Sequence, residues 1–312
     1  MGKILSALLL SVAVPACSDS SVSLSDLPAA AADAVCTYGA RCGQMPDVAS
    51  CKAAANFDTQ LLADVQAGRT KYDGKAAAAC FDAMRSGSCN YSDPFNAGEP
   101  QACKDAFKGT VADDGACYAD TECVSGSCSS GSCSGSGCCA RACSPSTAAV
   151  SVGGDCSGAG ALCVSGAFCQ YGTTSTCAAK AAAGQSCDPS YFSSSCADGT
   201  HCVANGPNTG ICGNLPAEGQ SCYPTGASPA CDSMLDYCDS VTLKCVPKIA
   251  AGGDCSTGAA CVGYATCDAT GRCVANPGAG DVCDDTNGPR CLGSLLCSSG
   301  TCTLPPATGV CP

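Results

Sequence analysis

Cysteine is the residue type that could carry most of the chemistry in this chain. The sequence has 35 cysteines in 312 residues, and cysteine sulfur can bind metal ions, act as a nucleophile or form disulfides. Structural zinc sites favour closely spaced cysteine pairs, often together with histidine. Here Cys-x-x-Cys and Cys-x-Cys are absent, and longer spacings dominate. The pattern favours disulfides, and we expect neither a metal nor another cofactor.

His201 is the only histidine, so a Ser-His-Asp or Cys-His catalyst would have to use it. It directly precedes Cys202, in a position that Phe168 and Tyr237 occupy before other cysteines. We therefore expect a ring packed on a disulfide. No Gly-x-Ser-x-Gly nucleophile motif occurs either. The sequence predicts no catalytic residue.

The N-terminus has the features of an export signal. Residues 1–16 contain Lys3 and an apolar stretch over 4–14 that is too short to span a bilayer. The stretch ends in Val-Pro-Ala-Cys, which resembles the lipobox of bacterial lipoproteins and implies lipid attachment at Cys17. Setting Cys17 aside leaves 34 cysteines, enough for 17 disulfides. We expect a lipid-anchored tether over 17–24, with cleavage after Ala16 without lipidation as the alternative.

Composition places the remaining chain on the oxidising side of a membrane. Cysteine usage is far above that of reduced cytosolic proteins. Without Lys3 the chain has 14 basic and 27 acidic residues, a balance that excludes nucleic acid as a partner and disfavours anionic headgroups. We predict a lipid-anchored protein of the cell envelope, at the outer membrane or surface of a Gram-negative bacterium.

Residues 25–110 are predicted to form an α-helical domain with six cysteines. Its alanine-rich helices bury little surface, so disulfides should lock their packing. The first expected helix is capped by Ser25 or Asp26, carries Pro28 in its first turn and ends at Arg41. The others cover 48–66, with Gly68 as the C-terminal stop, 75–85, capped by Asp73, and 101–107. Leu61, Leu62 and Val65 are expected on a buried face. From 15 possible connectivities we favour Cys36–Cys80, Cys42–Cys51 and Cys89–Cys103.

Residues 111–312 cannot build a conventional hydrophobic core. Leu, Ile, Val and Phe make up 24 of these 202 residues, a composition that predicts disorder unless cross-links intervene. The 28 cysteines of this region instead predict six tandem disulfide-rich modules with short β-hairpins. Their cysteines are 117/123/128/133, 156/163/169/177, 187/196/202/212, 222/231/238/245, 255/261/267/273 and 283/291/297/302.

Glycines recur in register with these cysteines. One precedes the first cysteine by three residues in five units, and another follows the second cysteine in five units, as expected where turns need positive φ. Between Cys267 and Cys273 we predict a hairpin with its turn at Thr270-Gly271. Near-equal spacing favours pairing of first with third and second with fourth cysteine. Each such bond contributes on the order of 3 kcal/mol.

Four cysteines fall outside the simplest repeat pattern. Cys138 and Cys139 are adjacent and should bond to separate partners, and with Cys143 and Cys311 they complete an even set. The sequence does not determine whether Cys311 pairs locally or with a distant cysteine.

The units carry Gly-x-x-Cys, then Cys, Gly, an aromatic residue before Cys, and a hairpin that ends in Cys. Asp236-Tyr237-Cys238 and Ala167-Phe168-Cys169 are examples. This pattern resembles the Dickkopf N-terminal cysteine-rich domain as it occurs in myxobacterial-type lipoproteins. The helical region is similar to that of such lipoproteins through Gly68-Arg69-x-x-Tyr72-Asp73 and Ala79-Cys80-Phe81. The resemblance implies architecture, and the Wnt-related activity of animal Dickkopf proteins is not carried over.

The variable loops between the first two cysteines of a unit are where recognition is expected. Tyr191, Phe192 and Tyr223 are the candidate recognition residues, in loops 188–195 and 223–230. We predict a non-enzymatic, extended binding or spacer element with an extracellular protein or glycan as ligand. Two alternatives stay open: hydrolase or inhibitor activity in the helical domain, and metal sequestration.

Overall fold

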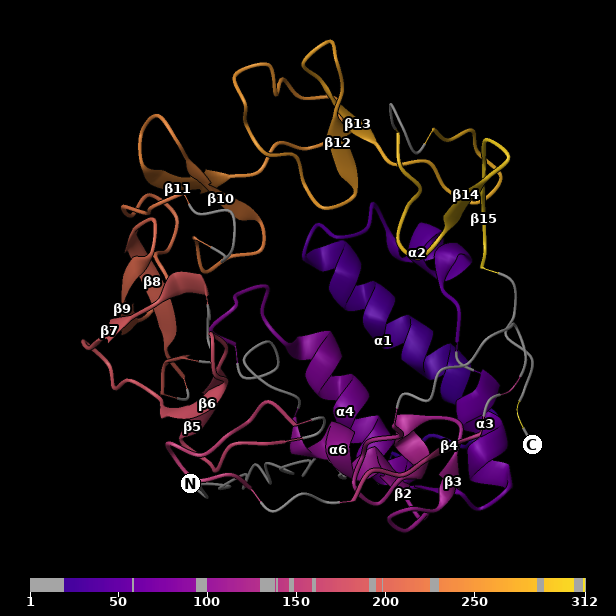
Figure 1. Ribbon diagram of the computed structural model, residues 1–312. Coiled ribbons are helices and arrows are strands. Elements are labelled where there is room, and N and C mark those ends of the chain that lie inside the picture. The colour runs from indigo at the N-terminus through magenta and orange to yellow at the C-terminus, as the bar shows by residue number, and fades with distance from the viewer. Residues whose placement is uncertain are drawn as a thin grey trace, which may run out of the picture.

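The computed structural model shows a helical domain surrounded by small disulfide-rich units (Figure 1). It describes residues 20–57, 59–93, 100–129, 138, 140–145, 149–158, 161–190, 195–197, 199–224, 230–284, 289–305 and 311. The helical domain contains α1 (Leu27–Arg41), α2 (Val48–Ala54), α3 (Thr59–Gln66), β1 (Thr70–Tyr72), α4 (Gly74–Ser86), α6 (Gln101–Ala106) and β2 (Phe107–Gly109). β1 and β2 pair as antiparallel strands.

Local signals in the sequence explain where most of these helices begin and end. Pro28 lies in the first turn of α1, where its missing N–H costs nothing. The Asp73 carboxylate accepts the amides of Lys75 and Ala76, so it caps α4 as expected. Gly68, with φ of 72°, ends α3. These three signals are confirmed.

The single helix predicted over 48–66 is wrong, because the chain forms α2 and α3 with a break between them. Ala55 has extended backbone angles at the end of α2. The expected buried face is also wrong. Leu61, Leu62 and Val65 are only half-buried, whereas Asp64 is 1% exposed. The spacing of apolar residues does not predict a buried carboxylate at this position.

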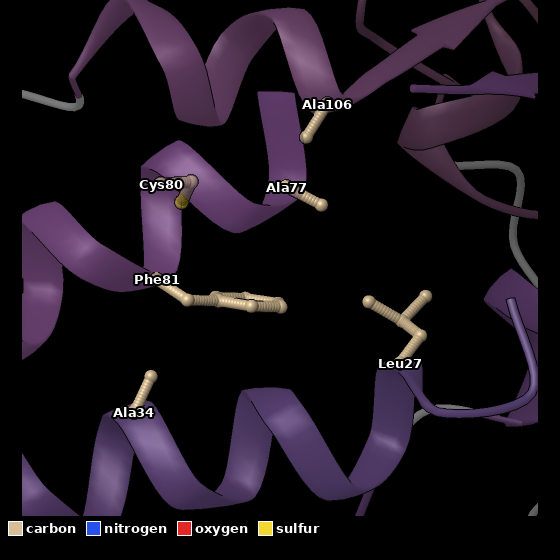
Figure 2. Close-up of a cluster of buried hydrophobic side chains, with 6 residues drawn as sticks. All are labelled: Leu27, Ala34, Ala77, Cys80, Phe81 and Ala106. Atoms are coloured by element: carbon tan, nitrogen blue, oxygen red, sulfur yellow. The ribbon is translucent and has the colours of Figure 1, made fainter. Parts of the chain in front are cut away.

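The core of the helical domain is small and rich in alanine. Figure 2 shows the Phe81 ring of α4 pointing toward Leu27 of α1, and the Ala34 side chain of α1 pointing toward Phe81. Ala77, Cys80 and Ala106 complete the buried set. Alanine lets the helices approach closely but buries little apolar area per residue. Covalent bonds between the helices therefore matter for stability.

All three disulfides predicted for this domain are wrong. The observed bonds are Cys36–Cys51, Cys42–Cys89 and Cys80–Cys103. They join α1 to α2, the end of α1 to the chain after α4, and α4 to α6. Each bond connects elements that are neighbours in space, which cysteine spacing alone does not reveal.

Six disulfide-rich units follow the helical domain. Their elements, in chain order, are β3 (Ala116–Cys117), η1 (Asp120–Glu122) and β4 (Arg141–Ala142); β5 (Ala167–Gln170) and β6 (Thr176–Ala179); β7 (Ser186–Cys187), β8 (His201–Gly206) and β9 (Thr209–Gly213); β10 (Asp236–Asp239) and β11 (Lys244–Pro247); β12 (Ala265–Cys267) and β13 (Cys273–Ala275); β14 (Leu296–Ser298) and β15 (Thr301–Thr303). In units two to six the third and fourth cysteines face each other across the hairpin strands.

Pairing of first with third and second with fourth cysteine is confirmed in units two to six. The bonds are Cys156–Cys169 and Cys163–Cys177, Cys187–Cys202 and Cys196–Cys212, Cys222–Cys238 and Cys231–Cys245, Cys255–Cys267 and Cys261–Cys273, Cys283–Cys297 and Cys291–Cys302. Buried cysteines make up the core of these units, as in the Cys196, Cys202 and Cys212 cluster. The predicted sulfur-based core is therefore present.

Unit one departs from the predicted cysteine order. Cys117 bonds to Cys128 as expected, but Cys123 bonds to Cys143 rather than to Cys133. Cys143 forms an antiparallel bridge with Cys128, which is the relation between fourth and third cysteines in the other units. Unit one thus has the same topology with a longer hairpin loop. Cys133 and Cys139 lie outside the described residues.

A backbone hydrogen bond shared by all six units explains why five of them have a glycine three residues before the first cysteine. In five units this glycine has positive φ, and its N–H donates to the carbonyl of the fourth cysteine, as in Gly252 to Cys273 at 2.7 Å. In unit one Asp114 takes this place with φ of 62° and donates to Cys143 at 2.9 Å. The left-handed conformation is thus common to all six units.

The units curve around the helical domain instead of extending away from it (Figure 1). Tyr91 N–H donates to the Asp232 carbonyl of unit four at 2.7 Å. Ser294 of unit six donates to the Ala54 carbonyl at 2.9 Å. Cys138 and Cys311, 173 residues apart, are joined by a disulfide that closes the ring. The expectation of an extended array is therefore corrected.

The left-handed turn in each unit gives a direct test of the framework. A Cβ at Gly252 would meet nothing within 4 Å, so Gly252→Ala adds only backbone strain. We expect the free energy of unfolding to fall by about 1 kcal/mol, measured by guanidinium denaturation with disulfides intact. Gly213→Ala is the matched control, because its Cβ is equally unobstructed but its φ is not positive. Equal stability of the two variants would contradict this assignment.

Candidate functional site

His201 is buried on β8, with 3% of its surface exposed. Burial lowers the pKa of His201, and Asp232 in the neighbouring unit opposes this shift. The neutral ring is therefore favoured inside the protein. This environment fits a structural residue better than a catalytic base that must reach a substrate.

Groups of three cysteine sulfurs lie within 4.8 Å of one another in several units. If these cysteines were reduced, three sulfur atoms at this distance could act as thiolate ligands of a metal ion such as zinc. However, every described cysteine is in a disulfide, sixteen bonds in all. Disulfide sulfur is not a thiolate, so metal binding here would require reduction first.

A surface groove of about 430 Å³ lies between units two and three. Phe168 and Gln170 of β5 line one side, and Asp188, Asn208 and Thr209 line the other. Its size lies within the range of small-ligand sites. One aromatic ring surrounded by amide, hydroxyl and carboxylate groups is suited to a sugar, whose apolar face packs on the ring while its hydroxyls form hydrogen bonds.

The groove adjoins one of the two loops in which recognition was expected. Asp188 and Ser195, the first and last residues of loop 188–195, both line it. Tyr191 and Phe192 lie outside the described residues, so their predicted role stays a prediction. Tyr223 is half-buried and is not part of the groove lining. Phe168 and Gln170 were missed as candidates, although their alternation along a hairpin strand places both on one face.

A second site, at the contact between the helical domain and unit one, buries two acidic side chains. Asp64 of α3 is 1% exposed and Glu122 of η1 is fully buried. Arg69 donates to Glu122 at 2.5 Å and to the Ala116 carbonyl at 2.6 Å. Gln60 donates to Asp64 at 2.6 Å. The cluster ties two parts of the chain together by charge-assisted hydrogen bonds.

The two carboxyls have different pKa shifts. Burial, together with the neighbouring Glu122 carboxylate, raises the pKa of Asp64 to about 6, against the lowering effects of Gln60 and Arg69. Burial alone would also raise the pKa of Glu122, but hydrogen bonds from Arg69, Tyr118 N–H and Asp64 hold it below its ordinary value. Among the described residues, Oδ2 of Asp64 and Oε1 of Glu122 have no hydrogen-bond partner. The interaction of the two carboxyls favours the protonated form of Asp64 and the ionised form of Glu122.

Comparison with known proteins adds no assignment to these sites. No family model, curated protein or solved structure matched this chain. In the part of the chain that the structure describes, the helices are all too short or too polar to cross a membrane. The interpretation of the sites therefore depends on their chemistry.

The raised pKa of Asp64 leads us to predict that the free energy of unfolding decreases as pH rises through about 6. Its pKa is higher in the folded chain, at about 6, than the ordinary value of 3.8, so the folded state binds the proton more tightly. Its contribution is therefore greatest at low pH and is lost as pH rises through about 6. Asp64→Asn should gain stability relative to the natural chain by about 3 kcal/mol between about pH 4 and about pH 7.

Guanidinium denaturation across this pH range measures the effect. Asp82→Asn, at a carboxylate whose side chain is 67% exposed, serves as the control for loss of one negative charge. A stability difference between Asp64→Asn and the natural chain that stays constant with pH would show that Asp64 does not hold a proton in the folded state.

Proposed function

We propose that this chain is a non-enzymatic lipoprotein of the cell envelope, anchored through Cys17, whose disulfide-rich ring binds an extracellular glycan or protein. The observation that carries the proposal is the closure of all 32 described cysteines into sixteen disulfides. Such a framework persists in an oxidising compartment outside the cytosol. The lipobox-like sequence before Cys17 supports the anchor, and the Dickkopf-like spacing of glycine and cysteine supports the kinship with myxobacterial-type lipoproteins.

A binding role is favoured over hydrolysis by the chemistry of the grooves. The groove at the helical domain lies between α1, α2 and unit six, and Ala, Val, Met and Phe dominate its lining beside Asn56 and Ser294. Hydrolysis needs convergent acids, bases or nucleophiles, and this lining does not supply them. The groove between units two and three combines an aromatic ring with polar groups, which favours recognition of a glycan.

Mass spectrometry of the mature protein tests both the anchor and the disulfides. We expect a chain that begins at Cys17 with a diacylglyceryl group, and no alkylation by iodoacetamide until reductant is added. An unmodified Cys17 with one reactive thiol would replace lipidation by ordinary signal cleavage. Many reactive thiols, or bound zinc, would overturn the proposed framework and favour metal sequestration.

The groove is tested by binding of the unacylated Cys17→Ser chain to purified cell envelopes. Phe168→Ala should weaken binding by roughly tenfold, because aromatic side chains in a contact often contribute more than 1 kcal/mol. Leu296→Ala is the control, since Leu296 is an exposed apolar residue on the hairpin of unit six. Periodate treatment of the envelopes should abolish binding to a glycan, whereas protease treatment should abolish binding to a protein. Equal binding of both variants would exclude the groove.

A further inference from the structure

Methionine is the side chain of this protein that is most open to oxidation. The described cysteines are all closed in disulfides, and the sequence contains no tryptophan. A thioether sulfur keeps a reactive lone pair in this setting, and peroxides convert it to a sulfoxide. After Met1 the chain has three methionines, Met45, Met84 and Met234. Their surroundings in the fold differ.

Met45 joins the helical domain to unit six. Its N–H donates to the Gly39 carbonyl of α1 at 3.2 Å, which fixes the position from which the side chain starts. The side chain packs against a cluster that contains Ala54 of α2 with Leu292 and Leu295 of unit six. This one residue therefore contacts α1, α2 and unit six.

Two glycines make the space that the Met45 side chain fills. A Cβ at Gly39 would lie 3.3 Å from Cγ of Met45, and a Cβ at Gly293 of unit six would lie 2.9 Å from Cε of Met45. The thioether therefore lies between glycine backbones from the two parts of the chain. If this side chain moved away, it would leave a cavity at the contact, and cavities in packed clusters are destabilising.

Met45 is also within reach of solvent. It is half-buried and lines the groove of about 480 Å³ between α1, α2 and unit six. A small oxidant such as hydrogen peroxide can enter a groove of this size. Met84 and Met234 do not line this groove. Met84 packs against the core of the helical domain, and the Met234 sulfur accepts a hydrogen bond from the Tyr38 hydroxyl at 3.4 Å, which engages a lone pair that oxidation would use.

We propose that Met45 is an oxidation site, and that its sulfoxide releases unit six from the helical domain. A lone pair of Sδ attacks one oxygen of hydrogen peroxide, the O–O bond breaks and an S–O bond forms. The proton on the transferred oxygen passes to the departing hydroxide, which leaves as water. The sulfur loses two electrons, and the peroxide gains them.

The change of polarity at Met45 is what breaks the contact. A sulfoxide is polar and hydrogen-bonds to water, whereas the cluster around Ala54 and Leu292 is apolar. The oxidised side chain therefore favours the groove over the space between Gly39 and Gly293. The inference is independent of the proposed anchor and of ligand binding.

Peroxide treatment of the purified protein, followed by peptide mass spectrometry, shows which methionine reacts. We expect the sulfoxide of Met45 to form before those of Met84 and Met234. Once Met45 is oxidised, amide hydrogen exchange in α2 should be about tenfold faster, because α2 loses its contact with unit six. Exchange in β5 and β6 of unit two, on the far side of the ring (Figure 1), is the internal reference and should not change.

Three variants separate oxidation of Met45 from a general effect of peroxide. Met45→Leu keeps an apolar side chain of similar volume, so exchange in α2 should stay slow with and without peroxide. Met45→Gln places a polar group in the cluster and should make exchange in α2 fast without peroxide. Met84→Leu is the matched control and should respond to peroxide as the natural chain does.

The proposal is overturned if Met84 or Met234 reacts before Met45, or if exchange in α2 is unchanged after Met45 is oxidised. An undiminished response of Met45→Leu to peroxide, or slow exchange in untreated Met45→Gln, would also overturn it. Intact disulfides, checked by thiol titration, confirm that each variant is folded.

Discussion

Crossed pairs of disulfides are the constraint on which the rest of this structure depends. Each unit has too few apolar residues to fold by burial alone, and its interior consists of cysteine, as in the Cys117, Cys123, Cys128 and Cys143 cluster. The two bonds of a unit fix the hairpin on which the third and fourth cysteines face each other. The left-handed residue before the first cysteine then hydrogen-bonds to the carbonyl of the fourth. Sulfur and backbone geometry together replace a hydrophobic core.

The helical domain and the ring of units stabilise each other. The alanine core of the helices is small, and a second cluster joins Ala54 of α2 to Leu292 and Leu295 of unit six. Gly43 and Gly263 allow close approach, because a side chain at either would clash with a neighbour from the other part of the chain. The ion pair between half-buried Arg69 and buried Glu122 joins the helical domain to unit one. The two parts are therefore packed against each other, although their main buried clusters are separate.

The sequence predicted what depends on local or repeated patterns. The cap at Asp73, the position of α1 and the disulfides of units two to six follow from such patterns. The pairing within the helical domain did not, since it depends on which helices become neighbours. Unit one was misassigned because a long loop separates its third and fourth cysteines. One repeated contact was not predicted. The residue six positions before the first cysteine of a unit forms backbone hydrogen bonds on either side of the second cysteine, as Val111 does beside Cys123 and Ile249 beside Cys261. The groove at Phe168 and the buried Asp64 arise from contacts between distant segments, which no local pattern encodes.

The bond between Cys138 and Cys311 has a mechanical consequence. A force applied to the two ends of the folded chain would act on the helical domain and unit one. It would then be transmitted through this bond to Cys311. The segment between these two cysteines, which are 173 residues apart, would carry no tension along its backbone. Units two to six would form a closed covalent loop outside the path of the force, and would keep their shape while the two ends of the chain are pulled apart.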